Sequence, residues 1–353
     1  MDTRDLPVRA KDGKTFDIVA QYHEHLQDND ITKPVAAIEA LVALLAASDY
    51  TTVFETLETV KSHSELLRAS VRNPVPLQAG TDLFLQYLVS SLKQQEVTAA
   101  AAAAASSSAG GVPAAPQSFE ETLRHLVANA RLFVDRAIAA RDGVADAGWR
   151  FVPDGKTVLT IGASRTVAGI LLKAASRYPA GDVGFRVVYV RDSSQPADSD
   201  RFVAQLRSAG IPVAEISELA VAHILSLRLR GKDQVHAVFV GAEAVTQSGG
   251  IISRLGTYQV AKLAHENKPR VPFYVAAETH KFVRKFPLGQ ADLGYDQTLL
   301  SFSSGDDAGA LPPKDAVDYT PPQYITNLIT ENGAKLPGYV LEQLLDIYGA
   351  LNS

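Results

Sequence analysis

Beyond about residue 150, short β-branched runs alternate with amphipathic stretches, and this alternation constrains the fold more than any other feature. The runs cover residues 157–161, 186–190, 212–216, 235–240 and 271–276. Stretches of helical period, such as 167–175 and 202–209, lie between most of them. Strands and helices in this order are typical of a doubly wound parallel sheet, whose strands are buried on both faces. We therefore predict an α/β protein that contains a Rossmann-like domain.

The first part of the chain has the period of helices instead. Apolar side chains recur at helical spacing at Val35, Ile38, Leu41 and Leu45. We predict a helical N-terminal domain over residues 1–146 and the Rossmann-like C-terminal domain over residues 147–353. Within the helical domain, residues 96–117 are rich in Ala, Ser and Gly. Such small side chains bury too little surface to offset the entropy of ordering, so we expect a disordered low-complexity loop there. The alternative is that the polyalanine extends a neighbouring helix, which Gly110, Gly111 and Pro113 would stop.

Composition excludes several classes of protein. A net charge of −5 over 353 residues argues against bulk electrostatic binding to nucleic acid or to anionic membranes. The chain has no cysteine, and therefore no disulfide, thiolate metal ligand or thiol nucleophile. We expect no cofactor, because neither the dinucleotide motif nor the P-loop motif occurs, and no metal, because His and carboxylates are not clustered. The polar N-terminus and the lack of an apolar run of about 20 residues predict a cytoplasmic protein without a membrane partner.

Ligands of doubly wound sheets bind at the carboxyl ends of the strands, which directs attention to the residues after the first run. Gly162 permits a tight turn there, and Ser164 can cap the following helix. Arg165 adds a positive charge to the free N–H groups of the helix N-terminus, and together these groups suit a phosphate. An ordinary capped helix with a surface arginine is the alternative.

A second candidate segment spans residues 241–257. Glu243 directly follows an apolar run, so its carboxylate is expected at the mouth of the crevice, where it could bind hydroxyls or act as an acid or base. Gly249 and Gly250 would let the backbone approach a ligand, and Arg254 could bind a phosphate through two hydrogen bonds. A glycine turn beside a solvated glutamate is the alternative interpretation.

The third segment follows the run that ends at residue 276. Glu278 and Lys281 could reach the same crevice. His280 is a candidate base, although a single histidine beside a strand is more often structural.

These three segments, in this order, carry a family resemblance. The stretches GAEAVTQSGGIISRLGT, PFYVAAETHKFVRKFPL and VDYTPPQYITNLIT resemble the family formed by the alpha, beta and delta subunits of translation initiation factor 2B. The same family includes methylthioribose-1-phosphate isomerase and ribose-1,5-bisphosphate isomerase. The stretch from Glu278 to Leu288 is the most specific, and it favours the regulatory alpha-subunit branch over the isomerases.

The resemblance implies a set of partners and a role. It implies a homodimer, built through the C-terminal domain, that bridges two beta–gamma–delta–epsilon assemblies of initiation factor 2B into a decamer. That complex exchanges guanine nucleotide on initiation factor 2, with the exchange chemistry in the epsilon subunit. The alpha subunit helps to sense the phosphorylated alpha subunit of initiation factor 2 under stress. The apolar residues of the C-terminal helix and of 282–287 agree with a dimer surface, or they complete the core.

The resemblance also bears on chemistry. The isomerases use a cysteine in the region of Gly162–Ser164, which this chain lacks, and an aspartate that matches Glu243. Their Asn-Lys pair matches Ser253 and Arg254. We therefore predict no catalytic residue and a retained pocket for a sugar phosphate or a nucleoside monophosphate, with an active phosphorylated-ribose isomerase as the alternative. The predicted ligand-binding residues are Gly162, Ser164, Arg165, Glu243, Gly249, Gly250, Ser253, Arg254, Thr257 and Lys281.

Overall fold

The computed structural model describes residues 16–28, 31–48, 50, 52–108, 119–179, 182–227, 234–295, 297, 299 and 315–349. Two compact units divide within helix α5 (Phe119–Gly148): a helical unit that runs to Ile138 and a Rossmann-like unit from Ala139 to Asp346. The final helix α10 (Tyr339–Gly349) also crosses the division, after Asp346. The boundary predicted at residue 146 lies further along α5. The end of this helix belongs to the second unit because Val144 is buried in the core of that unit.

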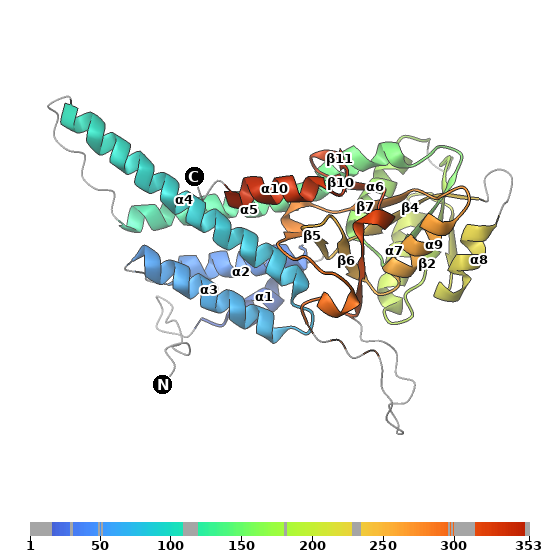
Figure 1. Ribbon diagram of the computed structural model, residues 1–353, viewed down its shortest axis with the longest axis horizontal. Coiled ribbons are helices and arrows are strands. Elements are labelled where there is room, and N and C mark those ends of the chain that lie inside the picture. The colour runs from blue at the N-terminus through green and yellow to red at the C-terminus, as the bar shows by residue number, and fades with distance from the viewer. Residues whose placement is uncertain are drawn as a thin grey trace, which may run out of the picture. The chain divides into compact units, whose positions relative to one another are not determined.

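The helical unit is built from four helices and the first part of α5 (Figure 1). The four are α1 (Ile18–His25), α2 (Lys33–Ala47), α3 (Val53–Ser70) and α4 (Val75–Ser108). Helix α2 lies at the centre and contacts α1, α3 and α4. The predicted apolar stripe of Val35, Ile38, Leu41 and Leu45 is fully buried in the core of this unit, which confirms the helical period.

Helix α4 differs from the sequence expectation at its end. It begins after Asn73 and Pro74, and the N–H of Val75 donates to Asn73 Oδ1 at 3.1 Å. The helix then continues through the alanine tract to Ser108, so residues 96–108 are helical rather than a loop. Alanine has the highest intrinsic helix propensity, and the backbone follows it. Residues 109–117 lie outside the described part of the chain.

The main sheet of the Rossmann-like unit has seven strands in the order β11-β10-β7-β4-β1-β2-β3. Five of them lie at the predicted runs and are all parallel: β1 (Thr157–Ile161), β2 (Arg186–Val190), β3 (Val213–Ile216), β4 (Val235–Gly241) and β7 (Phe273–Ala276). Parallel β10 (Asn327–Thr330) and antiparallel β11 (Gly333–Lys335) extend one edge. The predicted doubly wound fold is therefore confirmed.

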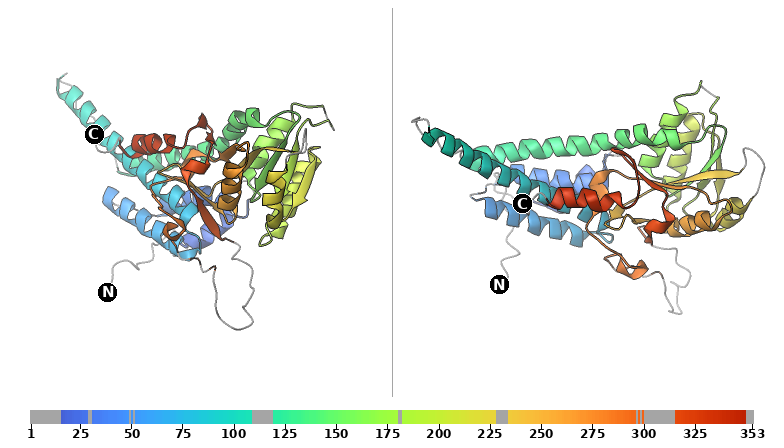
Figure 2. Two further views of the ribbon diagram at one scale, coloured as in Figure 1. Left: turned by 45° about the vertical axis from the view of Figure 1, so that its right-hand side comes forward. Right: turned by 45° about the horizontal axis from the view of Figure 1, so that its top comes forward.

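Helices cover both faces of this sheet (Figure 2). Helices α6 (Arg165–Ala175) and α7 (Pro196–Ser208) pack together on one face, and α8 (Val221–Ser226) and α9 (Thr257–Glu266) pack together on the other. The winding direction reverses between β1 and β4, which are neighbours in the sheet. Such a switch point opens a crevice at the carboxyl ends of the two strands, where ligands of doubly wound sheets bind.

A second, smaller sheet was not predicted from the sequence. Its order is β8-β5-β6-β9, from β5 (Ala244–Thr246), β6 (Ile251–Arg254), β8 (Phe282–Val283) and β9 (Val317–Thr320). The strands are too short to show a clear period in the sequence. Antiparallel pairing of β6 with β9 places Ser253 opposite Asp318 and Arg254 opposite Val317. This sheet therefore carries Arg254 and Asp318 on neighbouring strands although 64 positions separate them along the chain (318 − 254 = 64).

Candidate ligand-binding site

The turn between β1 and α6 forms one side of the switch-point crevice. Gly162 has a φ of +85°, a left-handed conformation that glycine adopts without strain. Ser164 is the N-cap of α6, and its Oγ accepts a hydrogen bond from the N–H of Val167 at 3.3 Å. Arg165 follows as the exposed first residue of the helix. The predicted capped helix start is therefore present, with a cation at its positive end.

The end of β4 interlocks with this turn. A Cβ on Gly241 would lie 2.2 Å from Ser164 Oγ, so only glycine fits at that position. The carbonyl of Gly241 accepts a hydrogen bond from Ser253 Oγ at 2.9 Å, and Ser253 is buried. Ser253 therefore joins β6 to β4. Because its side chain is buried, it supports the residues that form the crevice.

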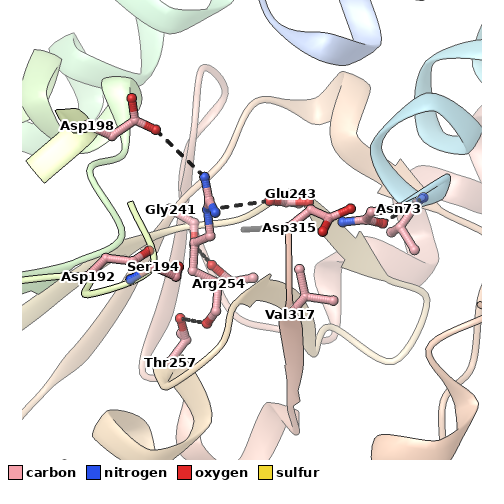
Figure 3. Close-up of polar contacts among 12 residues, drawn as sticks. Asn73, Asp192, Ser194, Asp198, Gly241, Glu243, Arg254, Thr257, Asp315 and Val317 are labelled. Atoms are coloured by element: carbon pink, nitrogen blue, oxygen red, sulfur yellow. Dashed lines mark hydrogen bonds and ion pairs between the residues drawn. The ribbon is translucent and has the colours of Figure 1, made fainter. Parts of the chain in front are cut away.

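Arg254 is the centre of the polar group at the crevice (Figure 3). Its Nε lies 3.8 Å from Glu243 Oε1, and its Nη2 lies 4.0 Å from Asp198 Oδ2. The aliphatic stem of Arg254 packs on the β1–α6 turn, because a Cβ on Gly162 would lie 3.3 Å from Arg254 Cγ. The guanidinium thus stands between two carboxylates, one from the connection between β4 and β5 and one from the first turn of α7. We call Arg254, Glu243 and Asp198 the switch-point triad.

Asp318 and Thr257 hold the backbone next to the triad. Asp318 is buried, and its carboxylate accepts hydrogen bonds from the N–H of Gly256 at 2.7 Å and of Tyr258 at 3.1 Å, which caps α9. Burial raises the pKa of Asp318, and the hydrogen bonds from the two N–H groups lower it. Burial has the larger effect, and the resulting pKa is about 7. Thr257 is also buried, and its Oγ1 donates to the carbonyl of Arg254 at 2.6 Å. Both residues fix the end of β6 and the start of α9.

Gly249 and Gly250 have a packing role in the hairpin between β5 and β6. A Cβ on Gly249 would lie 2.1 Å from the carbonyl oxygen of Pro337, and one on Gly250 would lie 2.6 Å from the ring of Tyr319. The close approach that these glycines allow is therefore to other parts of the chain. Their predicted contact with a ligand stays a prediction.

The third segment forms a buried cluster instead of an open surface. Lys281 Nζ lies 2.6 Å from Glu278 Oε2, and the other oxygen, Oε1, accepts from Thr166 Oγ1 at 3.0 Å. The residues Glu278, His280 and Lys281 are 1%, 4% and 8% exposed, so solvent and an entering phosphate have little access to them. The charge of Lys281 is balanced by Glu278, and its predicted contact with a phosphate stays a prediction.

The pKa values of this cluster reflect its burial. Burial is the largest influence and raises the pKa of Glu278, but the charges of Lys281 and His280 and the hydrogen bond from Lys281 together outweigh it and lower the pKa to about 2. Burial lowers the pKa of His280 to about 4, although Glu278 acts in the opposite direction. Neither ring nitrogen of His280 has a hydrogen-bond partner in the described structure. His280 is therefore a neutral core residue at physiological pH, as the structural interpretation expects.

Two residues of the site were missed by the sequence reasoning. Asp198 had a signal, because an acidic residue in the first turn of a helix that starts with Pro196, just after β2, lies next to the switch point. Asp318 lies in the family-like stretch VDYTPPQYITNLIT, but nothing in that stretch showed that it would reach α9, which it does through the second sheet. In the described residues there is no group of three or more His, Cys, Asp or Glu that could hold a metal ion. Across the same residues, no helix is long and apolar enough to cross a membrane.

The fold defines a doubly wound α/β protein with a polar crevice at its switch point. Residues 27–337 match the model of the initiation factor 2 subunit family, and the chain belongs to this family. The chain is 30% identical to the translation initiation factor eIF2B subunit alpha of Dictyostelium discoideum, over 95% of this chain and 98% of that protein.

Two further comparisons show similarity to an isomerase and to a chain of a solved complex. The chain is 32% identical to the ribose 1,5-bisphosphate isomerase of Archaeoglobus fulgidus, over 63% of this chain and 67% of the isomerase. The crystal structure of the tetrameric eIF2B-beta2-delta2 complex from C. thermophilum contains a chain with the same fold, with a TM-score of 0.64 at 19% identity. That alignment covers 93% of this chain and 95% of the other.

Proposed function

We propose that the chain is a non-catalytic regulatory subunit of the guanine-nucleotide exchange complex for translation initiation factor 2. The observation that carries this proposal is the similarity to an alpha subunit over nearly the whole of both chains. The subunit acts as a homodimer that bridges two beta–gamma–delta–epsilon assemblies into a decamer, and it helps to sense the phosphorylated alpha subunit of initiation factor 2 in the cytoplasm under stress.

Exposed apolar side chains support a dimer surface on the Rossmann-like unit. Leu341 and Leu345 are exposed and lie one turn apart on one side of α10. Phe286 and Leu288 are 64% and 84% exposed in the segment after β8. Large apolar side chains that gather in this way mark interaction surfaces more often than isolated ones do.

The assembly is tested by analytical ultracentrifugation of the purified chain, alone and mixed with the beta–gamma–delta–epsilon assembly. We expect a dimer alone and a decamer in the mixture. The substitution Leu345→Glu should weaken the dimer, whereas Leu219→Glu, at an equally apolar and 94% exposed position of the same unit, should not. A chain that stays monomeric and does not shift the assembly contradicts the proposal. Capture of the phosphorylated but not the unphosphorylated alpha subunit of initiation factor 2 by the decamer tests sensing.

We propose that the switch-point crevice binds a sugar phosphate or a nucleoside monophosphate without turning it over. Arg254 and Arg165, together with the N-terminus of α6, provide positive charge for the phosphate. Glu243 accepts hydrogen bonds from the hydroxyls. Binding stabilises the dimer if the ligand prefers the assembled state. Calorimetry with ribose 5-phosphate and adenosine monophosphate tests this proposal. No heat with either compound contradicts it.

The similarity to ribose 1,5-bisphosphate isomerase favours a second candidate, an active isomerase. The lack of any cysteine argues against it, because a serine such as Ser164 is a weak nucleophile without an adjacent base. A turnover assay with ribose 1,5-bisphosphate and methylthioribose 1-phosphate separates the two candidates. We expect no product. Turnover at an enzymatic rate would replace the regulatory interpretation.

A further inference from the structure

Asp198 stands at the switch-point triad although no family motif pointed to it. Its Oδ2 is 4.0 Å from Arg254 Nη2, on the side of the guanidinium away from Glu243 (Figure 3). Its other oxygen, Oδ1, is 3.5 Å from Arg201, one turn later on α7, and that arginine is well exposed to solvent. Asp198 thus adds a second carboxylate beside Arg254.

The backbone and the inner side-chain carbons of Arg254 are held in place. Its stem packs on Gly162, and its carbonyl is held by Thr257 Oγ1 at 2.6 Å. The residue before it, Ser253, is tied to the carbonyl of Gly241. A phosphate that binds the guanidinium therefore does so with Glu243 and Asp198 close by.

The charges of the triad select among ligands. Two carboxylates flank one guanidinium, and both separations exceed the range of a hydrogen bond, so each pair acts mainly through its charge. Carboxylates accept hydrogen bonds from sugar hydroxyls and repel phosphate oxygens. A ligand with one phosphate and several hydroxyls matches this arrangement, whereas a second phosphate near α7 would be repelled by the carboxylate of Asp198.

We infer that Asp198 is a specificity-determining residue that limits the ligand of this crevice to a single phosphate group. The inference rests on the proposed ligand-binding function, and it narrows the ligand class to monophosphates with free hydroxyls.

Calorimetry on the full chain tests the inference with two probes, ribose 5-phosphate and ribose 1,5-bisphosphate. The wild type should bind the monophosphate about tenfold more tightly, since one unit charge a few ångströms away in a half-exposed crevice contributes on the order of 1.4 kcal/mol, which is a factor of ten. In Asp198→Asn the bisphosphate should gain about tenfold relative to the monophosphate. The ratio of the two affinities is the readout, because both ligands gain from a more available Arg254.

The matched control is Asp200→Asn, which removes the same charge from the same helix. Asp200 pairs with Arg191 at 2.7 Å and not with Arg254, so the ratio should stay as in the wild type. An unchanged ratio in Asp198→Asn, with the monophosphate still bound, overturns this inference and leaves the proposed ligand site standing. An equal change in both variants also overturns it, because the effect is then one of net charge. If neither protein binds either probe, the ligand site itself falls.

Discussion

The two polar groups that follow strand ends of the Rossmann-like unit are built on opposite principles. In the cluster after β7, Glu278 and Lys281 are buried and 2.6 Å apart. In the switch-point triad, Arg254 lies 3.8 Å and 4.0 Å from its carboxylates, and Glu243 and Asp198 keep part of their surface in solvent. The charged groups of a tight buried pair have already lost their water and bind each other, so the pair contributes to the stability of the fold. A loose, half-exposed group keeps its capacity to bind something else.

The largest expected effect tests the buried side of this comparison. Glu278→Ala leaves the Lys281 ammonium buried without its partner, which costs about 3–5 kcal/mol of unfolding free energy. Urea unfolding of the variant measures the loss. The double variant Glu278→Ala/Lys281→Met removes both charges and should recover much of it. A single variant as stable as the wild type would contradict a structural role for the pair.

The pH dependence of stability also tests the buried cluster after β7. His280 has a pKa lowered by burial from 6.5 to about 4, so the unfolded chain binds a proton that the folded chain does not. Its contribution is fully present above pH 6.5 and is lost as the pH falls toward 4, by about 3 kcal/mol for a shift of this size. Unfolding at a series of pH values measures the slope.

The substitution His280→Phe is the control for that slope. It should remove the loss of stability that His280 causes as the pH falls from 6.5 to 4.5. It should leave the opposite dependence of Asp318, whose pKa is raised from 3.8 to about 7 in the folded chain, so that this carboxyl stabilises the fold as the pH falls through the same window. The stabilisation from Glu278, whose pKa is lowered from 4.5 to about 2, is fully present above pH 4.5 and is lost only below it, so Glu278 adds no slope in this window. The same slope in the variant would assign the pH effect to another group.

For the switch-point triad we expect a substitution to weaken ligand binding without a loss of stability. Arg254→Ala removes charge-assisted hydrogen bonds to the phosphate and should weaken ribose 5-phosphate about 10- to 100-fold, which corresponds to roughly 1.5–3 kcal/mol. Stability should change by less than about 1 kcal/mol, because the two ion pairs of Arg254 are long, at 3.8 and 4.0 Å, and partly exposed. Arg207→Ala, which breaks an exposed pair with Glu215 at 2.8 Å, is the control and should leave binding intact. If Arg254→Ala destabilises the fold as much as Glu278→Ala, the contrast between the two groups is wrong.

The smallest expected effect concerns Ser164, which caps a helix and is also a predicted ligand-binding residue. As the N-cap of α6 it contributes about 1 kcal/mol, which Ser164→Ala should remove and Ser164→Thr should largely keep. Thermal unfolding measures the cap. Calorimetry on the same two variants measures the ligand contact, and we expect a smaller loss than for Arg254→Ala. A larger loss would move Ser164 from support of the helix to direct contact with the ligand.

By itself, the sequence determined the class of fold, since the period of apolar residues reports local backbone geometry. The stripe from Val35 to Leu45 and the five β-branched runs of the main sheet needed no knowledge of long-range contacts. Capping at Ser164 was equally readable, because an N-cap acts only on the next few residues.

Only the tertiary structure decided which charged groups meet. Lys281 and Arg254 both follow strand ends and look alike in sequence, yet one is buried against Glu278 and the other faces the crevice. Asp198 and Asp318 reach the neighbourhood of Arg254 from α7 and from the second sheet. Burial and pairing of this kind depend on the folded arrangement of distant segments, and a charge has a different energy in a dry core and in a half-open crevice.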